Sequence, residues 1–213
     1  MRIAVIGTGN LARTLAHRFV RLGHEVMIAG GVDPHDMLAI KDATGAKDGT
    51  IREAADFADL VIVAIPFHRI EELPPDAFEG RIVVDATDYY PDRDGSCAEI
   101  ESGEVTSSEV LARHLPGARV VKAFNTPNLR TLGSVGHLVD DVDPVAVPIA
   151  GDDVVAKSTV GQLVAELGFD PVDAGTLADS WRLQSGARAH GLAAAAAELR
   201  AALNSETRVS APR

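Results

Sequence analysis

Residues 2–12 read Arg2-Ile3-Ala4-Val5-Ile6-Gly7-Thr8-Gly9-Asn10-Leu11-Ala12, an apolar run that leads directly into a glycine-rich turn. From Leu11 to Leu22 large apolar residues recur at helical spacing, and Gly23 follows them. A second apolar run occupies residues 25–29. The pattern predicts a strand, a turn, a helix and a second strand, because the apolar residues are continuous, then helically spaced, then continuous again.

The turn has the composition of a phosphate-binding turn. Gly7 allows the chain to leave the strand tightly, and Gly9 has no Cβ to block a phosphate that approaches the backbone. A helix that begins near Asn10 offers unpaired N–H groups and a partial positive charge to an anion. We therefore predict that Gly7, Thr8, Gly9, Asn10 and Leu11 bind the pyrophosphate of a dinucleotide. The alternative is a glycine turn that only packs.

Composition narrows the class of protein. The 213 residues are 46% hydrophobic and 24% charged, which is typical of a soluble globular protein. A net charge of −11 without a basic cluster argues against nucleic acid and anionic membranes as partners. Apolar runs such as 60–65 are too short to span a bilayer, and we see no signal peptide. The single cysteine, Cys97, excludes an intramolecular disulfide, so we expect a cytoplasmic protein with an inert thiol.

Apolar runs and helical patterns alternate along the chain. Further strands are predicted at 60–65, 81–86, 118–124, 145–150 and 169–174, and helices at 35–44, 50–58, 107–115 and 152–167. This alternation predicts an α/β fold, a Rossmann-like, doubly wound and mostly parallel sheet with helices on both faces. We expect a dinucleotide-binding domain at 1–176, a C-terminal helical extension at 177–204 and a disordered tail at 205–213.

Ligands of doubly wound sheets bind outside the carboxyl ends of the strands. The loops predicted to lie there are 7–11, 30–33, 65–68 and 123–126, and loop 86–93 is expected on the same rim. The candidate cofactor-binding residues beyond the first turn are therefore Gly30, Gly31, Asp33, Ile65, Pro66, Ala123, Asn125 and Thr126.

Longer motifs support a more specific assignment. They are Ile6-Gly7-Thr8-Gly9-Asn10-Leu11, Lys122-Ala123-Phe124-Asn125-Thr126 and Gly168-Phe169-Asp170-Pro171-Val172-Asp173-Ala174-Gly175. With these motifs the chain resembles the NADP oxidoreductases that use the deazaflavin coenzyme F420, and the related reductase domain of the STEAP metalloreductases. The resemblance implies an NAD(P)-dependent oxidoreductase that passes hydride between nicotinamide and F420. Because both cofactors carry that chemistry, we assign no catalytic side chain and no metal.

The end of the second predicted strand departs from the family pattern. Relatives that prefer NADP carry a Ser-Arg pair where this chain has Gly30-Gly31. Asp33 follows; it could accept hydrogen bonds from the ribose diol of NAD, or cap the next helix. Arg13 and Lys41 are possible phosphate partners or solvated helix charges. The chain could therefore bind NADP, or NAD, or both only weakly. We expect its affinity for NADP not to exceed its affinity for NAD by a hundredfold.

Several polar residues near the rim have two interpretations each. Asn125 and Thr126 could contact the nicotinamide amide or cap a turn. Lys122 is an outside candidate for acid/base chemistry, but an ion pair with Asp85 is the preferred interpretation. Asp88 stands where relatives have Asn and could alter the choice of partner or cap a turn.

Pro66 and Phe67 could form a wall of the ligand site or pack in the core, and His68 could donate to a ligand or be solvated. Two other functions also stay open. One is reduction of a small carbonyl or imine, with Lys122, His68 or Asp88 as the acid. The other is dinucleotide sensing without turnover. The Ala-rich helical pattern at 192–203 leads us to expect a homodimer formed through the C-terminal part.

Overall fold

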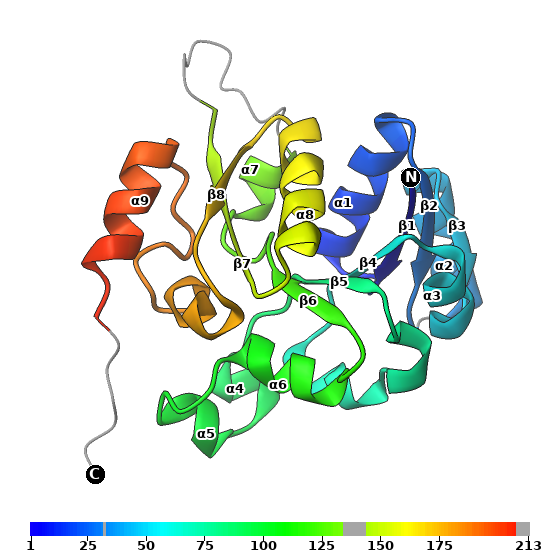
Figure 1. Cartoon of the computed structure of the whole chain (residues 1–213). Helices are drawn as coiled ribbons and strands as arrows, with labels where there is room; N and C mark the ends of the chain where they lie inside the picture. Colours follow the sequence, from blue (N-terminus) through cyan, green and yellow to red (C-terminus); the bar gives the residue numbers. More distant parts are fainter. Residues whose placement is uncertain (32, 134–143, 208–213) are drawn as a thin grey trace.

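A sheet runs through the middle of the molecule in the computed structural model, which describes residues 1–31, 33–133 and 144–207. In these residues the strand order is β3-β2-β1-β4-β5-β6-β7-β8 (Figure 1). Neighbouring strands from β3 to β6 pair in parallel, β7 is antiparallel to β6, and β8 is parallel to β7. The strands are β1 (Arg2–Ile6), β2 (Glu25–Ala29), β3 (Lys47–Gly49), β4 (Leu60–Val63), β5 (Ile82–Asp85), β6 (Arg119–Lys122), β7 (Ala146–Gly151) and β8 (Asp170–Asp173). The predicted doubly wound, mostly parallel sheet is confirmed.

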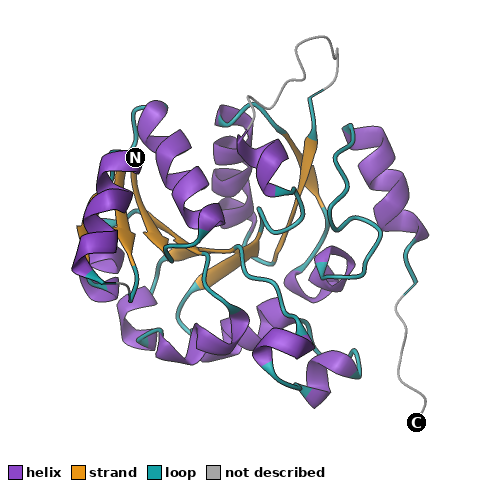
Figure 2. Ribbon diagram, turned by 180° about the vertical axis from the view of Figure 1, so that it is seen from behind, coloured by secondary structure: helices purple, strands orange, loops and turns teal. Residues whose placement is uncertain are grey.

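Helices cover both faces of the sheet (Figure 2). The α-helices are α1 (Asn10–Arg21), α2 (Pro34–Thr44), α3 (Ile51–Phe57), α4 (Pro91–Asp94), α5 (Ala98–Glu101), α6 (Ser107–His114), α7 (Leu129–Gly133), α8 (Val154–Glu166) and α9 (Ala196–Ser205). The 3-10 helices are η1 (Phe67–Glu72), η2 (Pro75–Phe78) and η3 (Leu177–Leu183). Helices α1, α2, α7 and α8 contribute to the core on one face, and α3, α5, α6, η1 and η2 to the core on the other.

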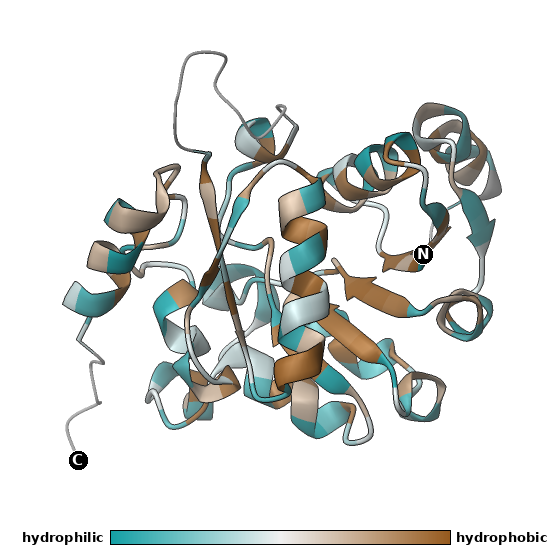
Figure 3. Cartoon of the chain, turned by 45° about the horizontal axis from the view of Figure 1, so that its top comes forward, coloured by the Kyte–Doolittle hydropathy of each residue, from teal (hydrophilic) through white to brown (hydrophobic). Residues whose placement is uncertain are grey.

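The first strand shows why the sheet needs two layers of helices. Ile3 and Val5 belong to the core shared with α1, whereas Ala4 and Ile6 belong to the core on the opposite face. Alternate side chains of a strand point to opposite faces, so an uninterrupted apolar strand is stable only when both faces are covered. Figure 3 shows the central strands as hydrophobic. Within the described ranges, no helix combines the length and apolarity that crossing a membrane requires.

The C-terminal part packs on the end of the same sheet. Leu183, Leu199 and Leu203 are buried with residues of β7 and β8 in a third apolar cluster. The helical pattern from 177 is not one helix, since turns separate η3 from α9. Gly186 and Gly191 lie in this connection with φ of 89° and 78°, a conformation that interrupts a helix. Of the tail predicted to be disordered, residues 208–213 lie outside the described residues.

Candidate functional site

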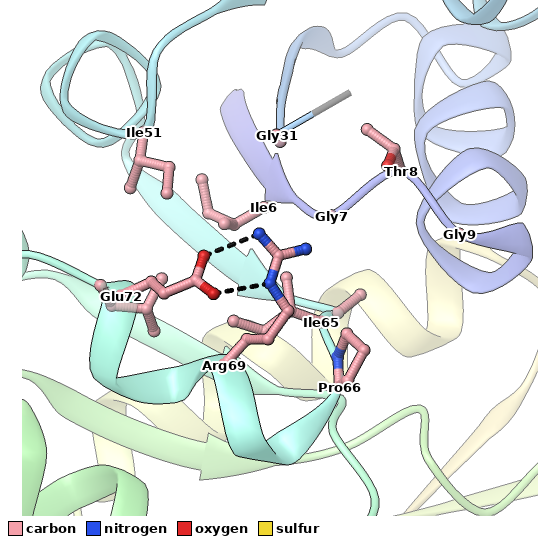
Figure 4. A pocket seen from close by; sticks show the side chains of 13 residues that line it. Ile6, Gly7, Thr8, Gly9, Gly31, Ile51, Ile65, Pro66, Arg69 and Glu72 are labelled. Carbon is pink, nitrogen blue, oxygen red and sulfur yellow. Dashed lines mark hydrogen bonds and ion pairs between the residues drawn. The ribbon is translucent and has the colours of Figure 1, made fainter. Parts of the chain in front are cut away.

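A cleft of about 260 Å³ lies at the carboxyl ends of β1, β2 and β4 (Figure 4). Its lining is Ile6, Gly7, Thr8, Gly9, Gly30, Gly31, Ile51, Ala64, Ile65, Pro66, Arg69, Glu72 and Leu73. Seven candidate residues from three predicted loops therefore meet in one cleft: Gly7, Thr8, Gly9, Gly30, Gly31, Ile65 and Pro66. Asn10 and Leu11 begin the helix that follows the turn.

The geometry of the first turn requires glycine. Gly7 has a φ of 131°, and a Cβ at this residue would lie 2.2 Å from the carbonyl oxygen of Ala64. Its N–H donates to the carbonyl of Ala29 over 2.7 Å, which joins the turn to the end of β2. A Cβ at Gly30 would lie 2.8 Å from Cγ2 of Thr8. Glycine at these two positions lets the three loops approach closely enough to form the floor of the cleft.

The N-terminus of α1 is open toward the cleft. Gly9 caps this helix without a side chain, and no acidic residue occupies its first turn. Apart from its two chain neighbours, no described residue has an atom within 4 Å of the position that a Cβ on Gly9 would take. The first N–H groups of a helix carry a partial positive charge, so this arrangement attracts an anion. Arg13 donates from Nε to the carbonyl of Thr8 over 2.7 Å, which holds the turn against the helix.

The polar residues near the end of β2 are occupied in other contacts. The Asp33 carboxylate accepts the N–H of His35 over 2.8 Å and caps α2, so of its two interpretations the structure shows the cap. Asp33 is not among the residues that line the cleft. Lys41 forms an ion pair with Asp48 at 2.8 Å. Neither residue brings a charge into the cleft.

A charged pair that is not among the predicted site residues also lies in the cleft. Arg69 and Glu72 belong to η1, directly after β4, and both line the cavity. Arg69 donates from Nε to Oε1 of Glu72 over 2.8 Å and from Nη2 to Oε2 over 2.7 Å. This hydrogen bonding raises the pKa of Arg69 and lowers the pKa of Glu72. The signal in the sequence was the spacing of Arg69 and Glu72, which places the two side chains on one side of a helical turn. Arg69 lies one residue beyond the predicted loop 65–68.

The candidates at the end of β6 lie apart from this cleft. Asn125 donates from Nδ2 to the Asp88 carboxylate over 3.0 Å and to the carbonyl of Leu183 over 2.7 Å. Thr126 and Ala123 are buried, and none of the three candidates lines the cavity. Within the part of the chain that the structure describes, Oδ1 of Asn125 and Oγ1 of Thr126 have no hydrogen-bond partner. A contact with nicotinamide stays a prediction.

The C-terminal segment crosses the carboxyl ends of β5 and β6. Besides the bond from Asn125 to Leu183, Gly191 donates its N–H to the carbonyl of Thr126 over 2.8 Å. Nε2 of His190 lies 3.4 Å from Oδ1 of Asp88. The segment therefore covers the strand ends next to the cleft.

Lys122 forms the predicted ion pair with Asp85. Both side chains are fully buried, and their charged atoms are 3.2 Å apart. Lys122 also donates to the carbonyl of Thr87, and Asp85 accepts from Thr87 N–H over 2.9 Å and from the Ser108 hydroxyl over 2.7 Å. The charge of Lys122 is thus paired with the charge of Asp85 in the interior, which favours a structural role over acid/base chemistry.

The loop after β4 is tied to the loop after β5. Phe67 is buried and packs edge-on against Tyr89 with ring centres 5.3 Å apart, which shows the core interpretation for this residue. His68 lies 2.8 Å from Asp94 through Nδ1. Burial raises the pKa of Asp94, but hydrogen bonds from Arg93, from the N–H of Tyr90 and from His68 outweigh it and hold that pKa well below its usual range. No group of three His, Cys, Asp or Glu side chains in the described ranges could hold a metal ion.

The glycine turn, the open helix N-terminus and a cleft at the strand ends define a Rossmann-type nucleotide-binding protein. Residues 2–89 match the model of the family described as "NADP oxidoreductase coenzyme F420-dependent". The chain belongs to this oxidoreductase family.

Similar proteins agree with the family assignment. The chain is 28% identical over 186 residues to Metalloreductase STEAP3 of Rattus norvegicus, covering 86% of this chain and 36% of the relative. It therefore spans about a third of the length of the curated relatives it matches. Hypothetical protein SMa0349 from Sinorhizobium meliloti is 30% identical, with a TM-score of 0.80 over 92% of this chain and 95% of its own.

Two further solved structures share the architecture. A putative F420-dependent NADP reductase from Arthrobacter sp. FB24 is 27% identical, with a TM-score of 0.72 over 85% of this chain and 87% of its own. An imine reductase from Aspergillus terreus, solved in complex with NADPH4, is 17% identical, with a TM-score of 0.63 over 85% of this chain and 57% of its own. The second of these likenesses shows the fold alone.

Proposed function

We propose that this chain binds NADP or NAD in the cleft and passes hydride between its nicotinamide and a second redox partner, the deazaflavin coenzyme F420. The observation that carries the proposal is the open N-terminus of α1 above Gly9, with no acidic residue in its first turn. A pyrophosphate is the anion that this turn fits, because the backbone is exposed to it and the helix dipole favours it. The name of the Arthrobacter relative supports F420 as the partner.

The protein's part in such a reaction is positioning. Hydride transfer between two cofactor rings needs no nucleophile from the chain, provided the rings are held in contact. The proton that reduction of F420 by NAD(P)H also consumes can come from solvent. The strand ends of β5 and β6 lie beside the cleft, and the C-terminal segment covers them through Leu183 and Gly191. We propose that the nicotinamide lies at these strand ends, with the unpartnered Oδ1 of Asn125 as acceptor for its carboxamide.

A direct assay tests the proposal. Purified protein is mixed with oxidised F420 and either NADPH or NADH, and loss of deazaflavin absorbance is followed. We expect protein-dependent turnover with at least one of the two dinucleotides. Tight dinucleotide binding without turnover in either mixture contradicts the enzymatic proposal.

One observation favours reduction of a small carbonyl or imine as a second candidate. Such a reaction needs an acid, and Lys122 and His68 are engaged with Asp85 and Asp94. Asp88, which accepts a hydrogen bond from Asn125, lies in the loop after β5 near His190, and the side chains of Asp88 and His190 are both about one-fifth exposed. If this function is correct, D88N abolishes NADPH-dependent imine reduction. If hydride passes to F420, D88N retains turnover, since no side-chain proton is required.

A further inference from the structure

The cleft contains one end that is lined by Gly30 and Gly31, which follow β2 and have no side chains, and the cation Arg69 also lines the cleft. In dinucleotide-binding folds the adenosine ribose lies at the end of the second strand, where a carboxylate contacts the diol or an arginine contacts a 2′-phosphate. Here Gly30-Gly31 follow the last residue of that strand, Ala29, and Asp33 caps α2. Any charged contact to the 2′ position must therefore come from another element.

Arg69 reaches this place from η1. A Cβ added to Gly31 would lie 3.4 Å from Nη2 of Arg69, so the guanidinium stands beside the end of β2. In Figure 4 the Arg69 side chain points into the cleft, and its guanidinium lies between Glu72 and the labelled Gly31. Because Gly31 has no side chain, the space next to the guanidinium is left for a ligand.

Glu72 fixes the guanidinium without using all of its donors. The two hydrogen bonds to Glu72 occupy Nε and one N–H of Nη2. Nη1 has no hydrogen bond to any residue in the described part of the chain. A planar guanidinium held on one edge can present its other N–H groups to phosphate oxygens in a fixed geometry.

We propose that Arg69, oriented by Glu72, binds the 2′-phosphate of NADP and takes the place of a basic residue after β2. This inference rests on the proposed dinucleotide function of the same cleft. It assigns the choice of cofactor to the loop after β4, and Gly30-Gly31 then provides room for the phosphate. Since Glu72 offsets part of the charge, we expect the preference for NADP over NAD to be about tenfold, less than an unpaired arginine clamp would give.

Calorimetric titrations with NADP and NAD test the proposal on wild type, R69A and R52A. Arg52 is the matched control, because it also donates two hydrogen bonds to a carboxylate, from Nη1 and Nη2 to Asp76 at 2.7 and 2.9 Å, outside the cleft lining. We expect R69A to weaken NADP binding about tenfold and to leave NAD binding within about twofold. R52A should leave both dissociation constants unchanged.

Three other results of these titrations would overturn either the proposal for Arg69 or the proposed function. Equal loss of NADP and NAD in R69A overturns the proposal, since it indicates that Arg69 contacts the adenine or shapes the cleft. Unchanged binding of both dinucleotides in R69A also overturns it, while the proposed function stands. Wild-type protein that binds neither dinucleotide refutes the proposed function itself. A second readout is salt: the NADP preference should shrink at higher ionic strength in wild type and stay flat in R69A.

Discussion

At the scale of single residues, the buried Lys122–Asp85 pair decides between two roles for the lysine. Both groups have exposures of 0%, and every charged atom has a partner inside the protein. A buried ion pair contributes little net stability, but the removal of one partner leaves an uncompensated charge. The lysine is therefore expected to matter for folding and not for the chemistry of hydride transfer.

The K122M variant tests this role. We expect its free energy of unfolding to fall by about 3–5 kcal/mol, because the Asp85 carboxylate loses its counter-charge. K122M/D85N should regain part of that loss, since Asn is neutral and can still accept the N–H of Thr87. Urea denaturation measures both. If K122M keeps wild-type stability but loses turnover, the lysine acts in catalysis.

Asp94 joins two loops near the cleft, and its ionisation is tied to stability. Its folded-state pKa is held below the unfolded value of about 3.9, so its carboxylate stabilises the fold above that pH. This contribution is lost as the pH falls through the folded-state pKa. We expect D94N to lose about 1–3 kcal/mol of unfolding free energy at pH 7 and to depend less on pH below 5 than wild type does. D92N, on an exposed residue of the same turn, is the control, and parallel pH curves for wild type and D94N would contradict the assignment.

At the scale of elements, α3 positions one wall of the cleft through Ile51, its first residue. Thr50 and Glu53 form a capping box, in which Thr50 Oγ1 accepts Glu53 N–H over 3.2 Å and Glu53 accepts Thr50 N–H over 2.8 Å. Two backbone donors that the helix leaves unpaired are thereby satisfied. The start of this helix is thus specified by local sequence.

Loss of the cap should be measurable. We expect T50A to lower the free energy of unfolding by about 1 kcal/mol, and T50S to restore most of it. Thr159, in the middle of α8 and bonded to the carbonyl of Val155, is the control. T159A should be neutral or stabilising, because a threonine inside a helix gains nothing from capping. Equal losses in T50A and T159A would show that the cap contributes nothing specific.

Elements with a local signal were predictable from the sequence, and those without one were not. The buried parallel strands and the Gly7 turn have continuous apolar runs and special backbone needs, which short-range patterns record. Strand β3 reads Lys47-Asp48-Gly49, which has no apolar run, although it pairs in parallel with β2. Arg69 was missed because its importance depends on the approach of η1 to β2, a contact between distant segments. The sequence shows that Gly30-Gly31 lack the basic residue of relatives that prefer NADP. It does not show that Arg69 lies beside these glycines.

At the scale of the whole molecule, the C-terminal part completes the fold instead of standing apart from it. Leu199 and Leu203 of α9 are buried against β7 and β8 of the same chain. The homodimer expected through this part stays a prediction, and an interface would have to use other residues of the segment. Sedimentation as a dimer at micromolar concentration is the expected result, and a monomer at that concentration would refute the expectation.

The central claim is that the glycine turn at residues 7–9, which precedes α1, binds the pyrophosphate of a dinucleotide. The measurement that tests it most directly is calorimetric titration of NADP into wild type, G9D and G9N. Apart from the two chain neighbours, no atom of the described residues lies within 4 Å of a Cβ at Gly9, so both variants should fold. Their side chains are nearly equal in size and differ in charge. We predict one site per chain in wild type and weaker binding in both variants, because either side chain occupies the place where the phosphate approaches the backbone. The loss should be at least tenfold in G9D and smaller in G9N, since only Asp adds repulsion at the helix N-terminus. Equal binding by G9D and wild type would contradict the claim.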